Sequence, residues 1–130
     1  MQLHHEIPDF AFAFRSVGGS SAVLEDREQV RLRELDQSFI VTPTLLETWQ
    51  APATVAGLTL EHLAPVLDLK PELVILGVGS TQQFPPAKVM AECLSRGIGL
   101  EAMTNTAAAR TFNLLASEGR NVAAAMLLAG

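Results

Sequence analysis

The stretch Leu73-Val-Ile-Leu-Gly-Val-Gly-Ser80 decides the fold of this chain. A short aliphatic run that ends in turn residues predicts a strand buried on both faces. Gly77 and Gly79 permit backbone angles, and a closeness of approach, that side chains forbid. Helical spacing begins after Pro86, so the unit is a strand, a glycine loop and a helix. Such a unit presents backbone N–H groups at the carboxyl end of a central strand, where open α/β sheets keep their ligand site.

A second strand and helix follow in the same order. Ile98 to Met103 fits a strand, and Thr104-Asn-Thr106 fits the start of a helix. The two strands are expected to be parallel neighbours, because a crossover of this size returns the chain to the same edge. Residues 122–128 could continue helically, but their place after Glu118-Gly-Arg120 favours a last buried strand. The second half therefore predicts a βαβαβ unit. The buried faces of its two helices are Val89, Met90, Cys93 and Leu94, and then Ala108, Phe112, Leu115 and Ala116.

The N-terminal third predicts an antiparallel β-meander. Phenylalanines alternate with alanines from Phe10 to Phe14, Val30 to Arg33 alternates apolar and charged residues, and Ser38 to Thr42 is a further apolar run. Ala22 to Leu24 is an additional short strand. No catalytic spacing occurs in this part of the chain.

The connection to the second half holds one expected helix. Thr59 is a suitable N-cap, and Pro65 predicts that the helix is short or kinked. Trp49 precedes it in a segment of little periodicity, and we interpret this residue as a packing anchor.

Length and composition indicate a single domain covering residues 1–130, with residues 1–9 as a loose tail that holds the solvated His4 and His5. Charged residues make up 18%, fewer than the roughly 25% of typical soluble domains. This favours a homo-oligomer or a protein partner. The net charge of −5 argues against a nucleic-acid surface.

The compartment follows from features that the sequence lacks. The single cysteine, Cys93, has no partner for an internal disulfide, so a reducing compartment is expected, and its thiol is expected to be buried and inert. There is no secretory signal pattern and no apolar run of about 20 residues that would span a membrane. These features predict a cytoplasmic protein.

Polar residues gather where the two parallel strands are expected to end. Their carboxyl ends would bring Gly77, Gly79 and Ser80 close to the helix start at Thr104, Asn105 and Thr106. Unpaired backbone N–H groups and hydroxyls of this kind suit a small anion. Arg110 and Asn113 continue a polar stripe along the helix, and Arg110 would add a bidentate contact to a carboxylate or phosphate. These eight residues form the candidate ligand site.

The same residues also have simpler interpretations. The dinucleotide motif fails because Gln82 stands at the third glycine position, and the lysine of a phosphate loop is missing. The polar stripe also fits the wet side of an amphipathic helix. Glu101 and Glu118 fit surface residues that nothing pairs. We therefore expect no catalytic set, no metal site and no cofactor.

The second half of the chain holds a set of short motifs: Leu76-Gly-Val-Gly-Ser80, Phe84-Pro-Pro86, Gly97-Ile-Gly-Leu-Glu-Ala-Met-Thr104, Ala109-Arg-Thr-Phe-Asn-Leu-Leu-Ala-Ser-Glu-Gly-Arg120 and Val122-Ala-Ala-Ala. In these motifs the sequence resembles the Mth-type domain family of unknown function, which includes mitochondrial complex I assembly factor 3. The Ser38–Pro43 strand with Trp49 fits the family, so the resemblance covers most of the chain. Phe112 stands where the family often has tyrosine.

The resemblance implies a three-layer α/β fold with a central mixed sheet, and no catalytic residues come with it. For the mitochondrial relatives it implies a role in building a respiratory complex through protein contacts. The chain has no Arg-rich presequence, so it is more like a bacterial member. Two hypotheses follow. The first is a non-enzymatic interaction or assembly protein, and the alternative is a small-molecule or anion-binding protein, or an enzyme, that uses the glycine loop and Arg110.

Overall fold

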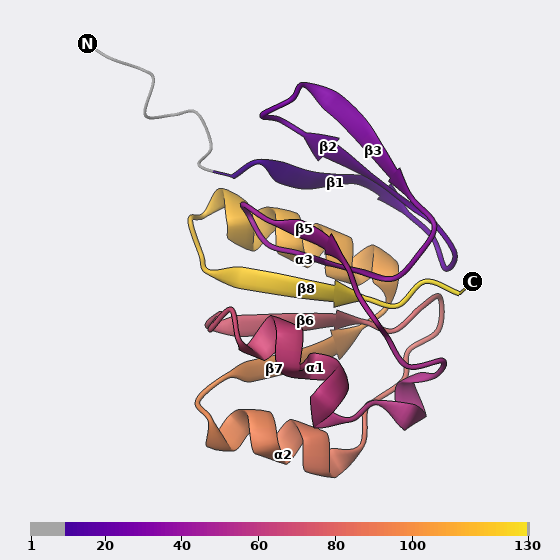
Figure 1. Cartoon of the computed structure of the whole chain (residues 1–130), viewed down its shortest axis with the longest axis vertical. Helices are drawn as coiled ribbons and strands as arrows, with labels where there is room; N and C mark the ends of the chain where they lie inside the picture. Colours follow the sequence, from indigo (N-terminus) through magenta and orange to yellow (C-terminus); the bar gives the residue numbers. More distant parts are fainter. Residues whose placement is uncertain (1–9, 130) are drawn as a thin grey trace.

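Two β-sheets and three α-helices make up the described part of the chain, residues 10–129 of the computed structural model (Figure 1). The tail predicted for residues 1–9, with His4 and His5, lies outside the described residues. One sheet is an antiparallel meander of β1 (Phe12–Val17), β2 (Ala22–Asp26) and β3 (Arg31–Leu35). The other is mixed and central, with the order β5 (Leu46–Thr48), β4 (Phe39–Val41), β8 (Val122–Met126), β6 (Leu73–Gly77) and β7 (Gly99–Met103).

The central sheet is the middle of three layers. The helices α1 (Leu60–Leu67) and α2 (Ala87–Ser95) cover one face, and α3 (Asn105–Ser117) shares the other face with the meander (Figure 1). Each face carries its own apolar core. Phe14 of the meander joins two parts of one core, because its ring centroid lies 5.9 Å from that of Phe39 and 5.6 Å from that of Phe112. The predicted three-layer α/β fold is confirmed.

The strand at the centre of the sheet is β8, the segment for which the sequence permits either a helix or a strand. All five of its residues are buried, and it lies between β4 and β6. Its alanines, Ala123 to Ala125, carry small side chains on both faces. The strand favoured for residues 122–128 is therefore present over residues 122–126, and it completes the sheet.

The N-terminal third is divided between the two sheets, which the sequence did not indicate. β4, expected to extend the meander, instead pairs antiparallel with β8, with Phe39 opposite Met126. β5 was not predicted at all. It pairs antiparallel with β4 at the sheet edge, and its three residues are mostly solvent-accessible, so they lack the apolar alternation that would reveal them.

The expected helix ends and anchors are present. The Thr59 side chain accepts a hydrogen bond from the His62 backbone at 3.3 Å, and the His62 ring accepts one from Thr59 N–H at 3.0 Å. Trp49 is buried and donates its indole N–H to the His62 carbonyl at 2.7 Å, which confirms it as a packing anchor.

One expected buried residue of α2 is exposed. Val89 and Cys93 are buried as predicted, but 75% of Leu94 is accessible to solvent. α2 covers the sheet near its β7 edge, so only a narrow stripe of the helix meets the sheet. The prediction that Leu94 belongs to this stripe was wrong.

Candidate functional site

Three parallel strands end at the same edge of the central sheet. β6 pairs with β7 so that Gly77 lies opposite Met103, and it pairs with β8 so that Gly77 also lies opposite Met126. The expectation that β6 and β7 are parallel neighbours is confirmed. We refer to the edge where β6, β7 and β8 end as the rim. The segments that leave these strands therefore start side by side.

Asn105, the first residue of α3, joins three chain segments at the rim. Its side chain is 1% exposed. Its Oδ1 accepts a hydrogen bond from Gly79 N–H at 3.0 Å, and its Nδ2 donates to the carbonyls of Gly18 and Leu127, each at 3.0 Å. The amide therefore holds the β1–β2 turn, the glycine loop and the exit of β8 together, and a buried amide with such partners avoids the cost of unmet hydrogen bonds.

The glycines of the loop meet different requirements. A Cβ on Gly77 would lie 2.5 Å from Asn105 Oδ1 and 2.7 Å from the Cε of Met126, so a side chain has no room there. Gly79 is not crowded, but its φ of +106° is a conformation that other residues rarely adopt. Gly77 allows the close approach of Asn105, and Gly79 allows the loop to turn back towards it.

A cavity of about 340 Å³ opens beside this network. Its walls come from the β1–β2 turn, the segment before the short helix η2 (Val55–Gly57), the glycine loop and the exit of β8. Backbone hydrogen bonds join three of these walls, because the exit of β8 donates from Leu127 to Gly77 at 2.9 Å and from Ala129 to Gly19 at 2.8 Å. The lining residues are Gly19, Pro52, Ala53, Thr54, Val55, Val78, Gly79, Ser80, Thr81, Gln83, Leu127, Leu128 and Ala129.

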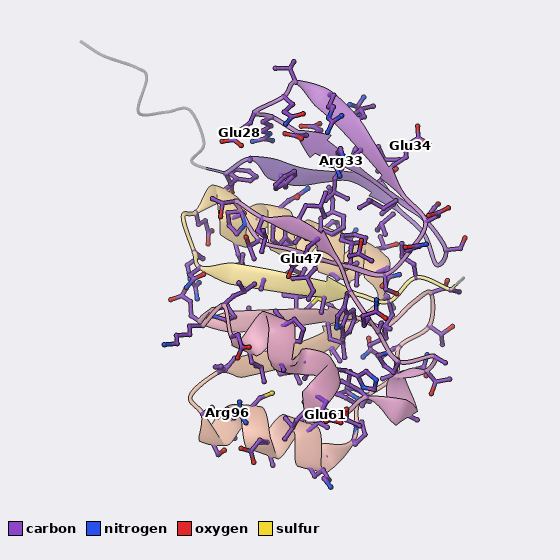
Figure 2. All side chains as sticks on the ribbon, in the orientation of Figure 1. Glu28, Arg33, Glu34, Glu47, Glu61 and Arg96 are labelled. Carbon is purple, nitrogen blue, oxygen red and sulfur yellow. The ribbon has the colours of Figure 1, made fainter. Side chains whose placement is uncertain are left out.

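No residue with an ionisable side chain is among those that line the cavity within residues 10–129. Its polar groups are hydroxyls, the Gln83 amide and backbone groups. In the described residues, the backbone N–H groups of Ser80 and Thr81 donate to no protein acceptor. None of the charged residues labelled in Figure 2 lines the cavity: Glu28, Arg33, Glu34, Glu47, Glu61 and Arg96.

The structure brings only part of the candidate ligand site together. Gly77, Gly79, Ser80 and Asn105 meet at the rim, and of these Gly79 and Ser80 line the cavity. Thr104 caps α3 by accepting a hydrogen bond from Ala107 N–H at 3.4 Å. It faces its own helix and does not line the cavity.

The remaining predicted residues lie further along α3. Thr106 and Arg110 are exposed and do not line the cavity. Asn113 faces the meander, where Oδ1 accepts from Phe14 N–H at 2.8 Å and Nδ2 donates to the Phe14 carbonyl at 2.9 Å. The pocket expected from Arg110 and Asn113 is therefore not formed with the glycine loop. The ligand-binding role of the residues at the rim stays a prediction.

Sequence reasoning missed the walls that come from distant segments. Gly19 had a signal, because the Gly18-Gly19 pair marks a turn. Residues 52–55 and 127–129 carry no motif and reach the rim only through the tertiary fold.

The groups with a shifted pKa lie away from the cavity. Glu72 and Arg120, which precede β6 and β8, form an ion pair at 2.7 Å at the opposite end of the sheet from the rim. The hydrogen bond from Arg120 lowers the pKa of Glu72 and raises that of Arg120. Burial raises the pKa of the Cys93 thiol, as expected for an inert cysteine.

The other candidates for chemistry are structural or exposed. Within residues 10–129 no cluster of three His, Cys, Asp or Glu side chains is suited to a metal ion. Asp26 is buried between two arginines, with Arg31 and Arg33 nitrogens each 3.8 Å from its Oδ2. Glu101 and Glu118 are exposed.

Residues 19–127 match the family described as "Protein of unknown function (DUF498/DUF598)". The chain belongs to this family. The solution structure of a Xanthomonas campestris protein is 47% identical, with a TM-score of 0.79 over 100% of this chain and 94% of that one. A Bordetella pertussis protein described as a Mth938-like domain is 22% identical with a TM-score of 0.75, over 100% of this chain and 94% of that one. The predicted Mth-type family and its fold are thus confirmed.

Two further proteins are similar in sequence to this DUF498/DUF598 member. A Francisella tularensis protein named "13 kDa major membrane protein" is 28% identical over 94 residues, 72% of this chain and 76% of that protein. A Danio rerio protein named "NADH dehydrogenase [ubiquinone] 1 alpha subcomplex assembly factor 3" is 32% identical over 90 residues. That match covers 68% of this chain and 51% of the relative. Among the helices of residues 10–129, none has the length and apolar character needed to cross a bilayer.

Proposed function

We propose that this protein is a non-enzymatic interaction protein that assists the assembly of a respiratory complex, acting in the cytoplasm of a bacterium. The observation that carries the proposal is the 32% identity to the relative named as a NADH dehydrogenase assembly factor. The match covers about half of that relative, so the role of the whole relative is extended here to the shared domain.

The chemistry of the rim favours binding over catalysis. A serine or threonine hydroxyl becomes an effective nucleophile when a neighbouring base removes its proton. Ser80 and Thr81 line the cavity, whose described lining has no ionisable side chain to serve as that base. The Cys93 thiol is fully buried on the side of α2 that faces the sheet. Neither the cavity hydroxyls nor the Cys93 thiol is therefore an activated nucleophile.

Exposed apolar side chains on the α2 side of the molecule suit a protein partner. Phe84, which precedes α2, is 71% exposed, and Leu94 near the end of α2 is 75% exposed. Covering such a side chain fully is worth about 1.5–3 kcal/mol. We infer that an apolar surface on a subunit of the growing complex covers this side of α2.

Gene deletion tests the proposed role. Loss of the protein should lower the amount of fully assembled NADH dehydrogenase on native gels, and NADH oxidation by membranes should fall in proportion. Levels of the individual subunit transcripts should not change, because the defect lies in assembly. Normal amounts of assembled complex in the deletion strain would contradict the proposal.

Complementation with variants tests the surface. The double substitution Phe84→Ser and Leu94→Ser should fail to restore assembly, because it removes the apolar contact while leaving the core intact. Leu114→Ser is the matched control, since Leu114 is 58% exposed on α3, across the central sheet from α2. Equal rescue by the double variant and the control would show that the α2 side is not the contact.

Small-ligand binding is the second candidate function, favoured by the preformed cavity beside the glycine loop. The version that relies on a small anion and Arg110 has weaker support, because Arg110 is exposed and outside the cavity lining. It requires that inorganic phosphate raise the melting temperature and that Arg110→Ala abolish this effect. Absence of any shift with phosphate would eliminate the anion version.

A further inference from the structure

We propose that the rim cavity binds a small uncharged ligand with a carboxamide or ketone group and a short aliphatic body. This inference rests on the second candidate function, ligand binding at the glycine loop, and specifies its ligand class. It is independent of the proposed assembly role. Three features of the cavity carry it: preformed walls, unpaired donors and the absence of charge.

The walls are held in place before any ligand arrives. Asn105 bonds the glycine loop to the β1–β2 turn and to the exit of β8. The backbone N–H of Leu127 also donates to the Gly77 carbonyl at 2.9 Å. A site whose walls are already ordered loses little conformational entropy on binding, so even a small ligand gains affinity.

The donors of the cavity suit a neutral acceptor. The N–H groups of Ser80 and Thr81 donate to no acceptor within the described residues, and both side chains carry hydroxyls in the lining. The carbonyl oxygen of an amide or ketone accepts such hydrogen bonds without bringing a net charge. The Gln83 side chain is partly used, because its Nε2 donates to the Val78 carbonyl at 3.5 Å.

Apolar walls define the other half of the ligand. Val55, Val78, Leu127 and Leu128 line the cavity and are each less than 10% exposed. They belong to the core and present only a small apolar surface to the cavity. A few aliphatic carbons match this surface, in keeping with the mixture of apolar walls and few polar groups typical of small-molecule sites.

The lack of charged side chains in the lining disfavours the other ligand classes. A charge that loses its water on binding is best held by an oppositely charged partner, because desolvation of an unpaired charge is costly. The described lining supplies no such partner. The net charge of −5 further disfavours an anion.

A pair of isosteric probes separates these classes. Isobutyramide and isobutyrate have the same shape and differ in charge. We expect isobutyramide to cause saturable amide shifts in a ¹H–¹⁵N NMR titration, centred on Ser80, Thr81 and residues 127–129. Isobutyrate should bind at least about tenfold more weakly, because its charge finds no partner in the cavity.

Two matched variants locate the binding. Ala53 is exposed and lines the cavity, so Ala53→Trp should place an indole over it and abolish the isobutyramide shifts. Ala56 is also exposed but outside the lining, so Ala56→Trp should keep them. Both positions are on the surface, so both variants should fold.

Each remaining outcome counts against the inference in a different way. Equal or tighter binding of isobutyrate would show that the cavity does not select an uncharged ligand. Isobutyramide shifts that survive Ala53→Trp would place binding elsewhere. No saturable shift with either probe would overturn both this inference and ligand binding at the loop, and would leave the assembly role untouched.

Discussion

The helices α2 and α3 follow neighbouring parallel strands, yet they meet their surroundings in different ways. α3 packs against both the central sheet and β1 of the meander, and Phe112 at its centre is fully buried. α2 meets the sheet with one narrow stripe, and Leu94 beside that stripe is 75% exposed. Similar strand–helix units therefore carry different constraints. α3 is held by packing and hydrogen bonds on two sides, whereas α2 packs against the sheet on one side only.

The largest difference in the free energy of unfolding is expected between alanine variants of Phe112 and Leu94. Phe112→Ala leaves a cavity between the sheet, α3 and Phe14, and should lower the free energy of unfolding by about 3–5 kcal/mol. Leu94→Ala removes an exposed side chain and should change it by less than about 0.5 kcal/mol. Urea denaturation of both variants measures the contrast. Similar losses would mean that Leu94 is buried in the protein as it exists in solution.

The next largest difference in stability is expected between substitutions of the two asparagines of α3. Asn105→Ala leaves Gly79 N–H and the carbonyls of Gly18 and Leu127 without their partner, at a cost of about 3 kcal/mol. Asn113→Ala affects only Phe14, in a half-buried position that water reaches, and should cost about 1–2 kcal/mol. The same denaturation series gives both values. A larger loss of stability for Asn113→Ala would contradict the claim that the Asn105 contacts stabilise the fold more.

The close approach of α3 to β6 gives a third comparison. Gly77→Ala should cost about 1–3 kcal/mol, because its Cβ would overlap Asn105 and Met126. Gly18→Ala is the control, since a Cβ there meets nothing within 4 Å and its φ is not positive. Its melting temperature should stay close to that of the wild type. An equally stable Gly77→Ala variant would show that the rim can widen.

The smallest effect concerns the ion pair at the other end of the sheet. The hydrogen bond from Arg120 lowers the pKa of Glu72 in the folded protein. Such a carboxyl stabilises the fold above its unfolded pKa, and the contribution disappears as the pH falls through the folded pKa. Glu72→Gln should thus lower the melting temperature slightly at neutral pH, and this deficit should shrink as the solution is acidified below the unfolded pKa of about 4.3. A deficit that grew towards acid would contradict this sign.

Much of the fold was predictable because local patterns agree with it. The aliphatic run of β6, the glycine loop after it and the periodicity of α3 predict parallel strands whose carboxyl ends meet. The two hydrogen bonds between Gly79 and Asn105 confirm that these ends lie together. Leu94 was misplaced because helical spacing alone does not give the width of the covered stripe.

The site was only partly predictable. Its walls at residues 52–55 and 127–129 depend on tertiary contacts that no local pattern encodes. Arg110 was assigned to the pocket from its spacing along α3, but spacing does not say which side of the helix faces the rim.

The exchange rate of the Gly79 amide hydrogen tests the central claim most directly, namely that buried Asn105 holds the rim in place. Gly79 N–H lies in a loop, and its acceptor is the Asn105 side chain. In native-state hydrogen exchange we expect this amide to be protected, unlike those of Ser80 and Thr81, and to lose protection in Asn105→Ala while Phe14 N–H keeps it. Exchange of Gly79 as fast as that of Ser80 in the wild type would contradict the account.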